Sequence, residues 1–366
     1  MKKIAFMSAL LLSGIISANI YAEGIKFDKP FTTTATITSP NNTKFANAKK
    51  QVTLMSIRLT DKQRRALLTF KPIKNTARKT RSDLPSSVYL EMNDVPVLDQ
   101  GMHGSCVTFA VTAAIDAVLG KKDHISQLCQ LELGSYLKYK GYYESGWNGA
   151  TAPIIYDQML RFGVVSKQKQ KTSGCAGVKS YPVNSFNEGN LMDTDEYRYL
   201  SEDISESLHA HTLMDEFERI TVLFSDDSDE DQTAIENTMD SIKTALNNGN
   251  RVTFGAFLVL APSCSVGACV SNKQTQDTWA ITNEVRQTHE NDRFAVGGHE
   301  MVITGYDDTA TVVDKNGMTH TGLLKLRNSW GEEVGDSGNF YMTYEYFKKF
   351  ALEAHEVVNL NMSSKK

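Results

Sequence analysis

A cysteine at the start of a predicted helix is the residue in this sequence best suited to nucleophilic chemistry. Cys106 follows a loop punctuated by proline and glycine, and apolar residues then recur at spacings of three and four: Phe109, Ala110, Ala113, Ala114, Ala117 and Val118. The sulfur is therefore expected beside unpaired N–H groups at the positive end of a helix, which favours the nucleophilic thiolate. Gln100, six residues earlier, carries a neutral amide that can donate to an oxyanion formed at that sulfur.

Two later segments carry the other residues that such chemistry needs. Gly297-Gly298-His299-Glu300-Met301-Val302-Ile303-Thr304-Gly305-Tyr306-Asp307 reads as a strand with a histidine near its start, and Lys325-Leu326-Arg327-Asn328-Ser329-Trp330-Gly331 offers an asparagine and a tryptophan. Together with Gln-Gly-x-x-Gly-Ser-Cys-x-x-Phe-Ala, these segments resemble the papain-like (cathepsin-type) cysteine peptidases in order, spacing and flanks. The resemblance covers about residues 84–359, with a gap in the middle.

The resemblance implies a role for each of these side chains. Cys106 would be the nucleophile, and His299 would take its proton and later protonate the departing amine. Asn328 would orient the imidazole, and Trp330 would keep water off that hydrogen bond. The Gln100 amide and the Cys106 backbone N–H would form the oxyanion hole. No single residue is diagnostic, since a lone cysteine on an apolar helix more often packs in the core than takes part in chemistry. The hypothesis therefore depends on the joint pattern.

Peptide binding is assigned more weakly, to two glycines. Gly149 falls where the family pairs its backbone with extended substrate, although a plain loop glycine fits that position equally well. Gly298 directly precedes the histidine. The resemblance implies no cofactor and no metal, and the acidic run at 225–231 lacks the ordered spacing of a calcium loop.

Three residues depart from the family's pattern. His103 stands where the family usually has a second cysteine, Val107 replaces an aromatic residue, and Val334 replaces a second tryptophan. All three departures predict a looser scaffold around the site. His103 is disfavoured as the base, because the sequence offers it no orienting partner.

The N-terminus predicts export. Residues 1–22 combine a positive start, a short apolar stretch and small residues before an expected cut after Ala22, as a signal peptide does. No later apolar run is long enough to span a bilayer. We therefore expect a secreted or periplasmic protein that does not reside in the membrane.

The cysteine count gains meaning from export. Five cysteines in an oxidising compartment suggest one free thiol and two disulfides. If Cys106 is the free thiol, three pairings of the other four remain possible. We favour Cys129–Cys175, which would staple the helical half, and Cys264–Cys269, which would close a small loop.

Residues 23–83 form a basic leader. Fourteen basic and four acidic residues lie between Glu23 and Leu84, whereas the chain beyond has 23 basic and 39 acidic residues. Because the complementary charge lies on the same chain, we expect an intramolecular inhibitory lid rather than a nucleic-acid-binding arm. Residues 31–38 and 51–59 alternate like a hairpin around a turn at 40–42, and a short helix is expected over 62–70. The family's helical propeptide motifs are absent, so a plain extension stays an alternative.

Residues 84–366 are predicted to be the peptidase domain, in an α+β, papain-like two-lobed fold. Helices are expected over 106–119, 126–140 and 153–161, and strands over 251–260, 299–306, 321–326 and 339–343. One half would thus be helical and the other β-barrel-like, with the active-site cleft between them. An acidic surface insertion at about 184–240 would explain why His299 lies 193 residues beyond Cys106.

The sequence thus predicts a secreted thiol peptidase made as a zymogen. It would act as a monomer on peptide or protein substrates, with its own propeptide as inhibitor and no nucleic-acid partner. A catalytically silent peptide-binding protein of the same fold is the main alternative. A transglutaminase-like acyl transferase is a third, but that class generally completes its triad with a carboxylate, and this segment offers Asn328.

Overall fold

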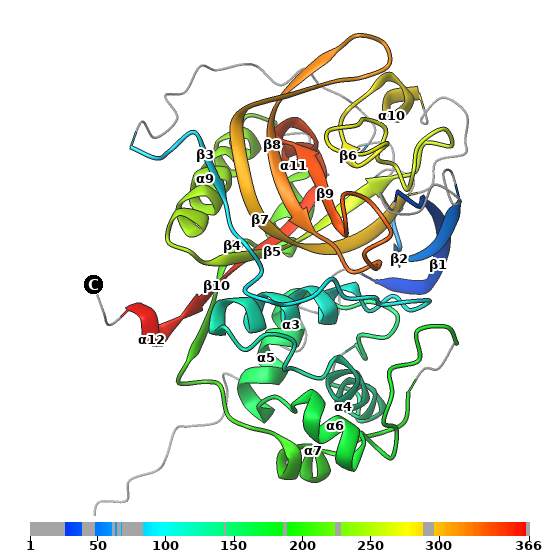
Figure 1. The fold of residues 1–366 in the computed structure, drawn as a ribbon, viewed down its shortest axis with the longest axis vertical. Coiled ribbons are helices and arrows are strands. Elements are labelled where there is room, and N and C mark those ends of the chain that lie inside the picture. Colours follow the sequence, from blue (N-terminus) through cyan, green and yellow to red (C-terminus); the bar gives the residue numbers. More distant parts are fainter. Residues whose placement is uncertain are drawn as a thin grey trace, which may run out of the picture.

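The computed structural model describes residues 26–38, 48–60, 63, 67, 83–142, 144–185, 189–223, 228–287 and 296–363. The expected signal peptide, the turn at 40–42 and nearly all of the helix expected over 62–70 lie outside these ranges. The chain folds into a helical half and a sheet half, stacked one on the other (Figure 1). The α+β class predicted from the sequence is confirmed.

The helical half follows the apolar periodicity of its sequence. Its five helices are α3 (Cys106–Leu119), α4 (Gln127–Tyr139), α5 (Ala152–Phe162), α6 (Lys167–Ser173) and α7 (Thr194–Leu200). α3 is buried on all sides from Cys106 to Val118, as expected of a helix that lies between two layers. It ends at Gly120, whose φ of 64° is the left-handed conformation that closes helices.

The sheet half is built around one long strand. β7 (Val296–Val313) pairs with β5 (Arg251–Val259) on one side and with β8 (Thr319–Arg327) on the other. The full order is β4-β10-β5-β7-β8-β9-β6, with short β3 (Ser87–Tyr89) added to β7; the remaining strands are β4 (Leu208–Met214), β6 (Thr278–Trp279), β9 (Asn339–Thr343) and β10 (Ala351–Asn359). The expected barrel-like half is corrected here, because this path of described strands stays open between β4 and β6.

The remaining helices surround the sheet. They are α8 (Glu216–Leu223), α9 (Ser228–Asn247), α10 (Asn283–Gln287), α11 (Tyr344–Phe350) and α12 (Leu360–Ser363). The acidic stretch at 184–240 does not lie wholly on the surface: β4 pairs with β10, and Ile235 and Met239 of α9 enter the sheet's core. The burial of Ile235 and Met239 gives α9 an apolar face inside an otherwise polar stretch.

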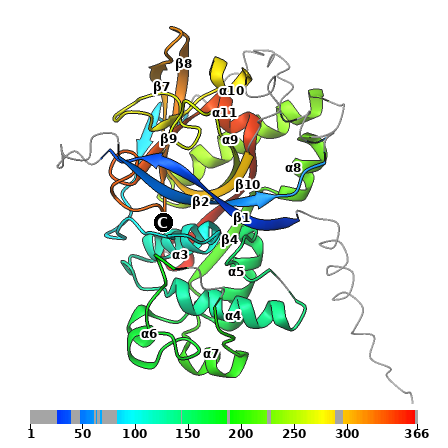
Figure 2. The same cartoon turned by 90° about the vertical axis from the view of Figure 1, so that its right-hand side faces the viewer.

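The leader forms the predicted hairpin. β1 (Phe27–Thr36) and β2 (Lys49–Ile57) pair antiparallel along their length. Figure 2 shows this blue hairpin crossing in front of the boundary between the sheet half and α3. Residues 52–55 of β2 are all buried, so this strand packs as a core strand of the molecule although it belongs to the leader.

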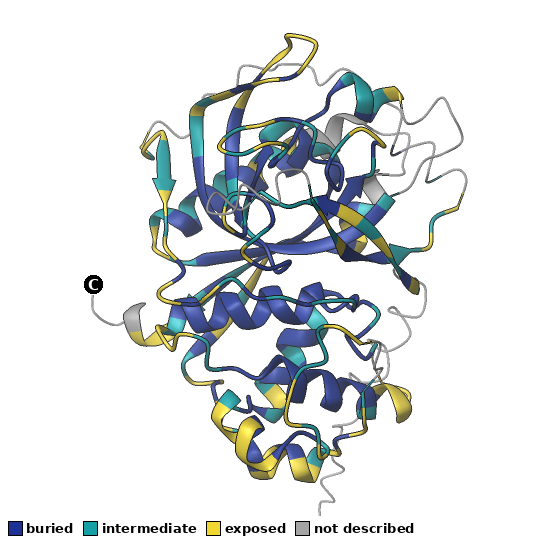
Figure 3. Cartoon of the chain, turned by 45° about the vertical axis from the view of Figure 1, so that its right-hand side comes forward, coloured by how far each residue is buried: buried dark blue, intermediate teal, exposed yellow. Residues whose placement is uncertain are grey.

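α3 lies at the junction of the two halves. Its buried surface faces the underside of the sheet (Figure 3), and residues of α3 share one hydrophobic cluster with Val302 of β7 and Met55 of β2. Burial of this continuous apolar surface fixes the start of α3 against the start of β7. That junction holds the residues singled out by the sequence.

Candidate active site

Cys106 is the first residue of α3 and the free cysteine among the five. The preceding Ser105 makes no side-chain cap, so the first amides of the helix remain available to the sulfur. Burial is the largest influence on the thiol and raises its pKa to about 12, although the N–H groups of Glu300, Val107 and Cys106 itself act in the opposite direction. The expected thiolate is therefore not favoured while the site is covered.

His299 lies in the sheet half, opposite the helix that carries Cys106, and neighbours in that same half hold its imidazole. Its Nε2–H donates to Asn328 Oδ1 at 2.8 Å, since an amide oxygen can only accept. The indole of Trp330 stacks on the ring, with centroids 4.3 Å apart and planes 22° apart. Burial lowers the pKa of His299 to about 4, so the ring is neutral.

The Cys106 sulfur lies against the strand segment that carries His299. The backbone N–H of Glu300, the next residue, is close enough to the sulfur to influence its pKa. His299 Nδ1 has no hydrogen-bond partner within the described ranges. With Nε2 engaged by Asn328, Nδ1 is the nitrogen left to exchange a proton with the sulfur.

Gln100 joins the two halves at this point. Its Nε2 donates to the carbonyl of His103 at 2.8 Å and to the carbonyl of Thr53 at 3.3 Å. Its Oε1 accepts from the Ser329 hydroxyl at 2.8 Å. The side chain is thereby fixed beside the start of α3, and one of its donors already holds a peptide carbonyl that belongs to the leader.

Tyr181 is a residue of this site that sequence reasoning missed. Its hydroxyl donates to the Gln100 carbonyl at 2.8 Å and lies 2.9 Å from the Ser105 hydroxyl. It thus braces the residues that flank the nucleophile. Residues 175–185 show no periodic pattern, so no signal in the sequence pointed to this tyrosine.

His103 belongs to the same support. Its Nε2–H donates to the carbonyl of Pro182 at 3.0 Å, and its ring packs edge-on against Trp147 and Tyr181. The loop that lacks the family's second cysteine is thus held by aromatic packing and a hydrogen bond. These contacts give His103 a structural role in holding the loop before α3.

The leader covers both glycines assigned to substrate. A Cβ added at Gly149 would meet the ring of Phe27 at 2.7 Å, and φ is 131° there. Gly298 pairs with Met55 of β2, and a Cβ there would meet the Ile57 side chain at 2.6 Å. Both positions therefore lack a side chain where another strand of peptide approaches closely.

Lys50 of the leader hairpin makes charged contacts beside the site with residues that follow the leader. Lys50 Nζ lies 2.7 Å from an Asp99 carboxylate oxygen and 2.6 Å from one of Glu333, and it donates to the Trp330 carbonyl at 2.9 Å. Burial opposes the charge, but the hydrogen bonds to both carboxylates outweigh it and raise the pKa of Lys50. The charge complementarity expected between leader and body occurs at this cluster.

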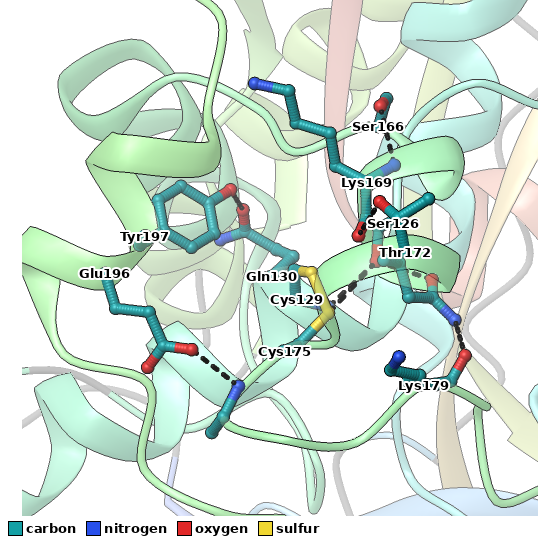
Figure 4. Close-up of a disulfide and its surroundings, with 12 residues drawn as sticks. Ser126, Cys129, Gln130, Ser166, Lys169, Thr172, Cys175, Lys179, Glu196 and Tyr197 are labelled. Carbon is teal, nitrogen blue, oxygen red and sulfur yellow. Dashed lines mark hydrogen bonds between the residues drawn. A yellow bond between two sulfur atoms is a disulfide. The ribbon is translucent and has the colours of Figure 1, made fainter.

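The two disulfides pair the remaining cysteines as favoured from the sequence. Cys129–Cys175 links α4 to the loop after α6, and Cys264–Cys269 closes a short loop. Figure 4 shows the first bridge, where the Ser126 hydroxyl accepts from the Cys129 N–H and donates to Gln170. This bridge braces the half that carries Cys106.

Part of the chain is similar to a known family. Residues 228–365 match the family model described as Peptidase C1-like family. The resemblance to papain-like cysteine peptidases is confirmed there. The matched segment contains His299, Asn328 and Trp330, whereas Cys106 and Gln100 precede it. No curated protein matches the chain.

Solved structures of cysteine proteases are also similar to the chain. Xylellain from Xylella fastidiosa is 19% identical over 80% of this chain and 91% of its own, with a TM-score of 0.47. Clostridial Cwp84 is 15% identical over 75% of this chain and 59% of its own, with a TM-score of 0.47. Digestive procathepsin L 3 of Tenebrio molitor is 16% identical over 77% and 72%, with a TM-score of 0.42. At these scores nothing about activity follows from the likeness.

Within the described ranges, no helix has both the length and the apolar character that crossing a bilayer requires.

Proposed function

We propose that this chain is a papain-like cysteine peptidase, exported and made as a zymogen, that hydrolyses peptide bonds. The observation that carries the proposal is the arrangement at the junction of α3 and β7: a free thiol at a helix start, an imidazole held by Asn328, and a Gln100 amide bonded to His103 on one side and to Ser329 on the other. A nucleophile, a proton carrier and an oxyanion donor are the parts that acyl transfer requires.

The reaction would run in two halves. The Cys106 sulfur attacks the carbonyl carbon of the substrate while its proton passes to His299 Nδ1, and the Gln100 amide and the Cys106 N–H stabilise the oxyanion. The C–N bond then breaks, and the amine leaves with the proton from His299. Water hydrolyses the thioester with His299 as base, which restores the thiol and releases the acid.

The leader would act as an intramolecular inhibitor by occupying the cleft as a peptide does. The Thr53 carbonyl accepts from Gln100, and Met55 pairs with Gly298 beside the imidazole. Because the sulfur and the imidazole are both fully buried under this cover, both stay neutral and no substrate can reach them. Cleavage after the leader, near residue 83, would open the site.

The test compares the purified full-length protein with its Cys106→Ala variant. The parent should convert at low pH to a species that lacks the leader and should then hydrolyse a protein substrate, whereas the variant should do neither. Addition of a trace of mature parent to the variant shows whether its leader can still be cleaved in trans. Equal conversion and equal hydrolysis by both proteins would overturn the proposal.

A catalytically silent peptide-binding protein remains the alternative, since the same cleft could hold a strand without cutting it. An epoxide-type thiol inhibitor separates the two functions. After leader removal, a peptidase takes up one label on Cys106, whereas a silent binder takes up none.

A further inference from the structure

A second polar cluster is buried on the sheet, apart from the hydrogen bonds of the site above. Glu216 lies at the start of α8, and Glu353 and His355 lie two residues apart on β10, so both point to one face. One potential ligand atom from each of these three residues lies within 4.8 Å of the others. All three side chains are more than nine-tenths buried.

The imidazole and one carboxylate of this cluster are already held in place. His355 Nε2 lies 3.2 Å from Glu353 Oε2, and His355 Nδ1 lies 3.3 Å from the Thr212 hydroxyl. The Glu353 carboxylate also accepts from the Ala152 N–H at the start of α5. Because a carboxylate only accepts, Nε2–H donates to Glu353 in this structure. A metal bound at Nε2 would require the proton on Nδ1, from which it would donate to the Thr212 hydroxyl.

A fourth side chain reaches this face. Glu300 is fully buried, and neither of its carboxylate oxygens makes a hydrogen bond of normal geometry within the described ranges, although Glu353 and Thr253 lie close enough to influence its pKa. It lies on β7 opposite Gly255, where an added Cβ would meet Glu300 Oε2 at 2.7 Å and the Glu353 side chain at 3.1 Å. The missing side chain at Gly255 thus leaves room for two carboxyl groups to meet. Glu216 Oε2 is also without a partner.

The charges of this cluster do not balance. Three carboxyl groups share a buried space with one imidazole, and buried carboxylates are stable only when paired, protonated or bound to a metal. A small divalent cation would supply the charge and the bonds that these oxygens lack.

We propose that Glu216, Glu353 and His355 form a zinc-binding site, with Glu300 as a fourth ligand. One imidazole and several carboxylates are a donor set that Zn²⁺ accepts, with bonds of about 2.0–2.2 Å. Such bonds place tetrahedral ligand atoms about 3.3 Å apart, and the separation of His355 Nε2 and Glu353 Oε2 is 3.2 Å. The ion would join β10, β7 and the start of α8.

A hollow of about 460 Å³ lies at the edge of the sheet. It is lined by residues of β4, α8, α9 and the turn between β4 and α8, among them Thr212, Asp215 and Glu218. Thr212 also contacts His355. The two acidic side chains would raise the local concentration of cations in this hollow.

The experiment measures Zn²⁺ binding by equilibrium dialysis on full-length protein that carries Cys106→Ala, because a catalytic thiol can itself bind zinc. We expect one ion per chain and a higher melting temperature with Zn²⁺ than with a chelator. In the same background, His355→Gln and Glu353→Gln should each weaken binding at least tenfold. Thr212→Val, which removes only the group that orients His355, should weaken it about 10- to 100-fold.

The matched control replaces the exposed neighbouring imidazoles, His209→Gln with His211→Gln, and should bind as the parent does. Melting temperatures in chelator identify any variant that fails to fold, and Thr212→Val, on an exposed side chain, then carries the test. The proposal is overturned if the parent binds no stoichiometric zinc. It is equally overturned if binding survives His355→Gln and Thr212→Val but is lost with the two surface histidines.

Discussion

His299 and Glu300 are neighbours on β7, yet their surroundings differ. The imidazole is held by residues of the same chain: Asn328 accepts a hydrogen bond from its Nε2–H, Trp330 stacks on it, and the leader covers it. The Glu300 carboxyl meets other carboxyl groups instead, and burial raises its pKa well above the usual value. Two buried polar groups side by side are thus stabilised differently, one by a built hydrogen-bond network and one by a proton or an added cation.

The contrast indicates where reactivity can be controlled. Around His299, the covering element is the hairpin of β1 and β2, and its removal under the proposed function would return water to the sulfur and the imidazole. Around Glu300, the neighbouring elements are α3 and the sheet itself, which form the core of the fold. On the proposed function, the reactive side of β7 is therefore the His299 side.

The largest effect is expected from His299→Ala. Loss of the proton carrier should lower kcat/KM of the leader-free enzyme by about 10³-fold or more, since general base catalysis contributes about 10²–10⁴ and the thiol also loses its ion-pair partner. Hydrolysis of a fluorogenic peptide measures it, with exposed His209→Ala as the control. Activity within tenfold of the parent would contradict the role of His299 as the base, because the base would then lie elsewhere.

The next effect is expected from Gln100→Ala. Removal of one oxyanion donor should lower kcat by about 10²–10³-fold with a small change in KM, because the donor acts mainly on the tetrahedral oxyanion. Steady-state kinetics of the leader-free enzyme measure the split. A change confined to KM would mean that Gln100 only binds the substrate and leaves the oxyanion to other donors.

Acid should favour release of the leader. Burial under the leader lowers the pKa of His299 to about 4 from its usual 6.5, so the covered form binds this proton less readily than an uncovered form. The equilibrium therefore shifts away from the covered form as the pH falls from about 6.5 towards 4. At pH 5 the ratio of covered to uncovered protein is lower by roughly thirtyfold. Limited proteolysis of the leader in Cys106→Ala, from pH 8 to pH 4, measures this change.

The matched protein for the pH series is Cys106→Ala with His299→Gln, which has no imidazole to titrate at the site. Its leader should open with a much weaker dependence on pH in this window. If both proteins respond alike, other groups drive the acid response, and protonation of His299 does not control leader release.

The smallest effect is expected from Lys50→Ala. Lys50 contacts Asp99 and Glu333 at a partly exposed position, where such ion pairs contribute little each. The variant should therefore label at Cys106 only about two- to tenfold faster than the parent while the leader is attached. Lys49→Ala, on the neighbouring exposed side chain, should label at the parent's rate. Equal rates for all three proteins would show that apolar burial alone holds the hairpin.

Local patterns in the sequence predicted much of the structure. The periodicity after Cys106 gave the bounds of α3 as they are, and β-branched alternation located β5, β8, β9 and the leader hairpin. These features depend on neighbours in the chain, so a sequence reveals them. The grouping of Gln100, Cys106, His299 and Asn328 came from family resemblance, because no local rule brings such distant residues together.

What the sequence could not predict depends on long-range packing. The hairpin was expected, but nothing local says that Thr53 faces Gln100 or that Met55 pairs with Gly298. The thiolate expected at the helix start was overridden by burial, which the leader imposes from elsewhere in the chain. The carboxyl groups of Glu300 and Glu353 come together only after β7, β5 and β10 have paired, and therefore no local motif indicates their cluster.

Labelling of Cys106 by an epoxide-type inhibitor at neutral pH, followed by mass spectrometry of the intact protein and its peptides, tests most directly whether the leader covers a reactive thiol. Labelling should be slow or absent while the leader is attached, and one label should form on Cys106 soon after the leader is removed. Equally fast labelling before and after removal would contradict the cover, and no labelling after removal would contradict the reactive thiol.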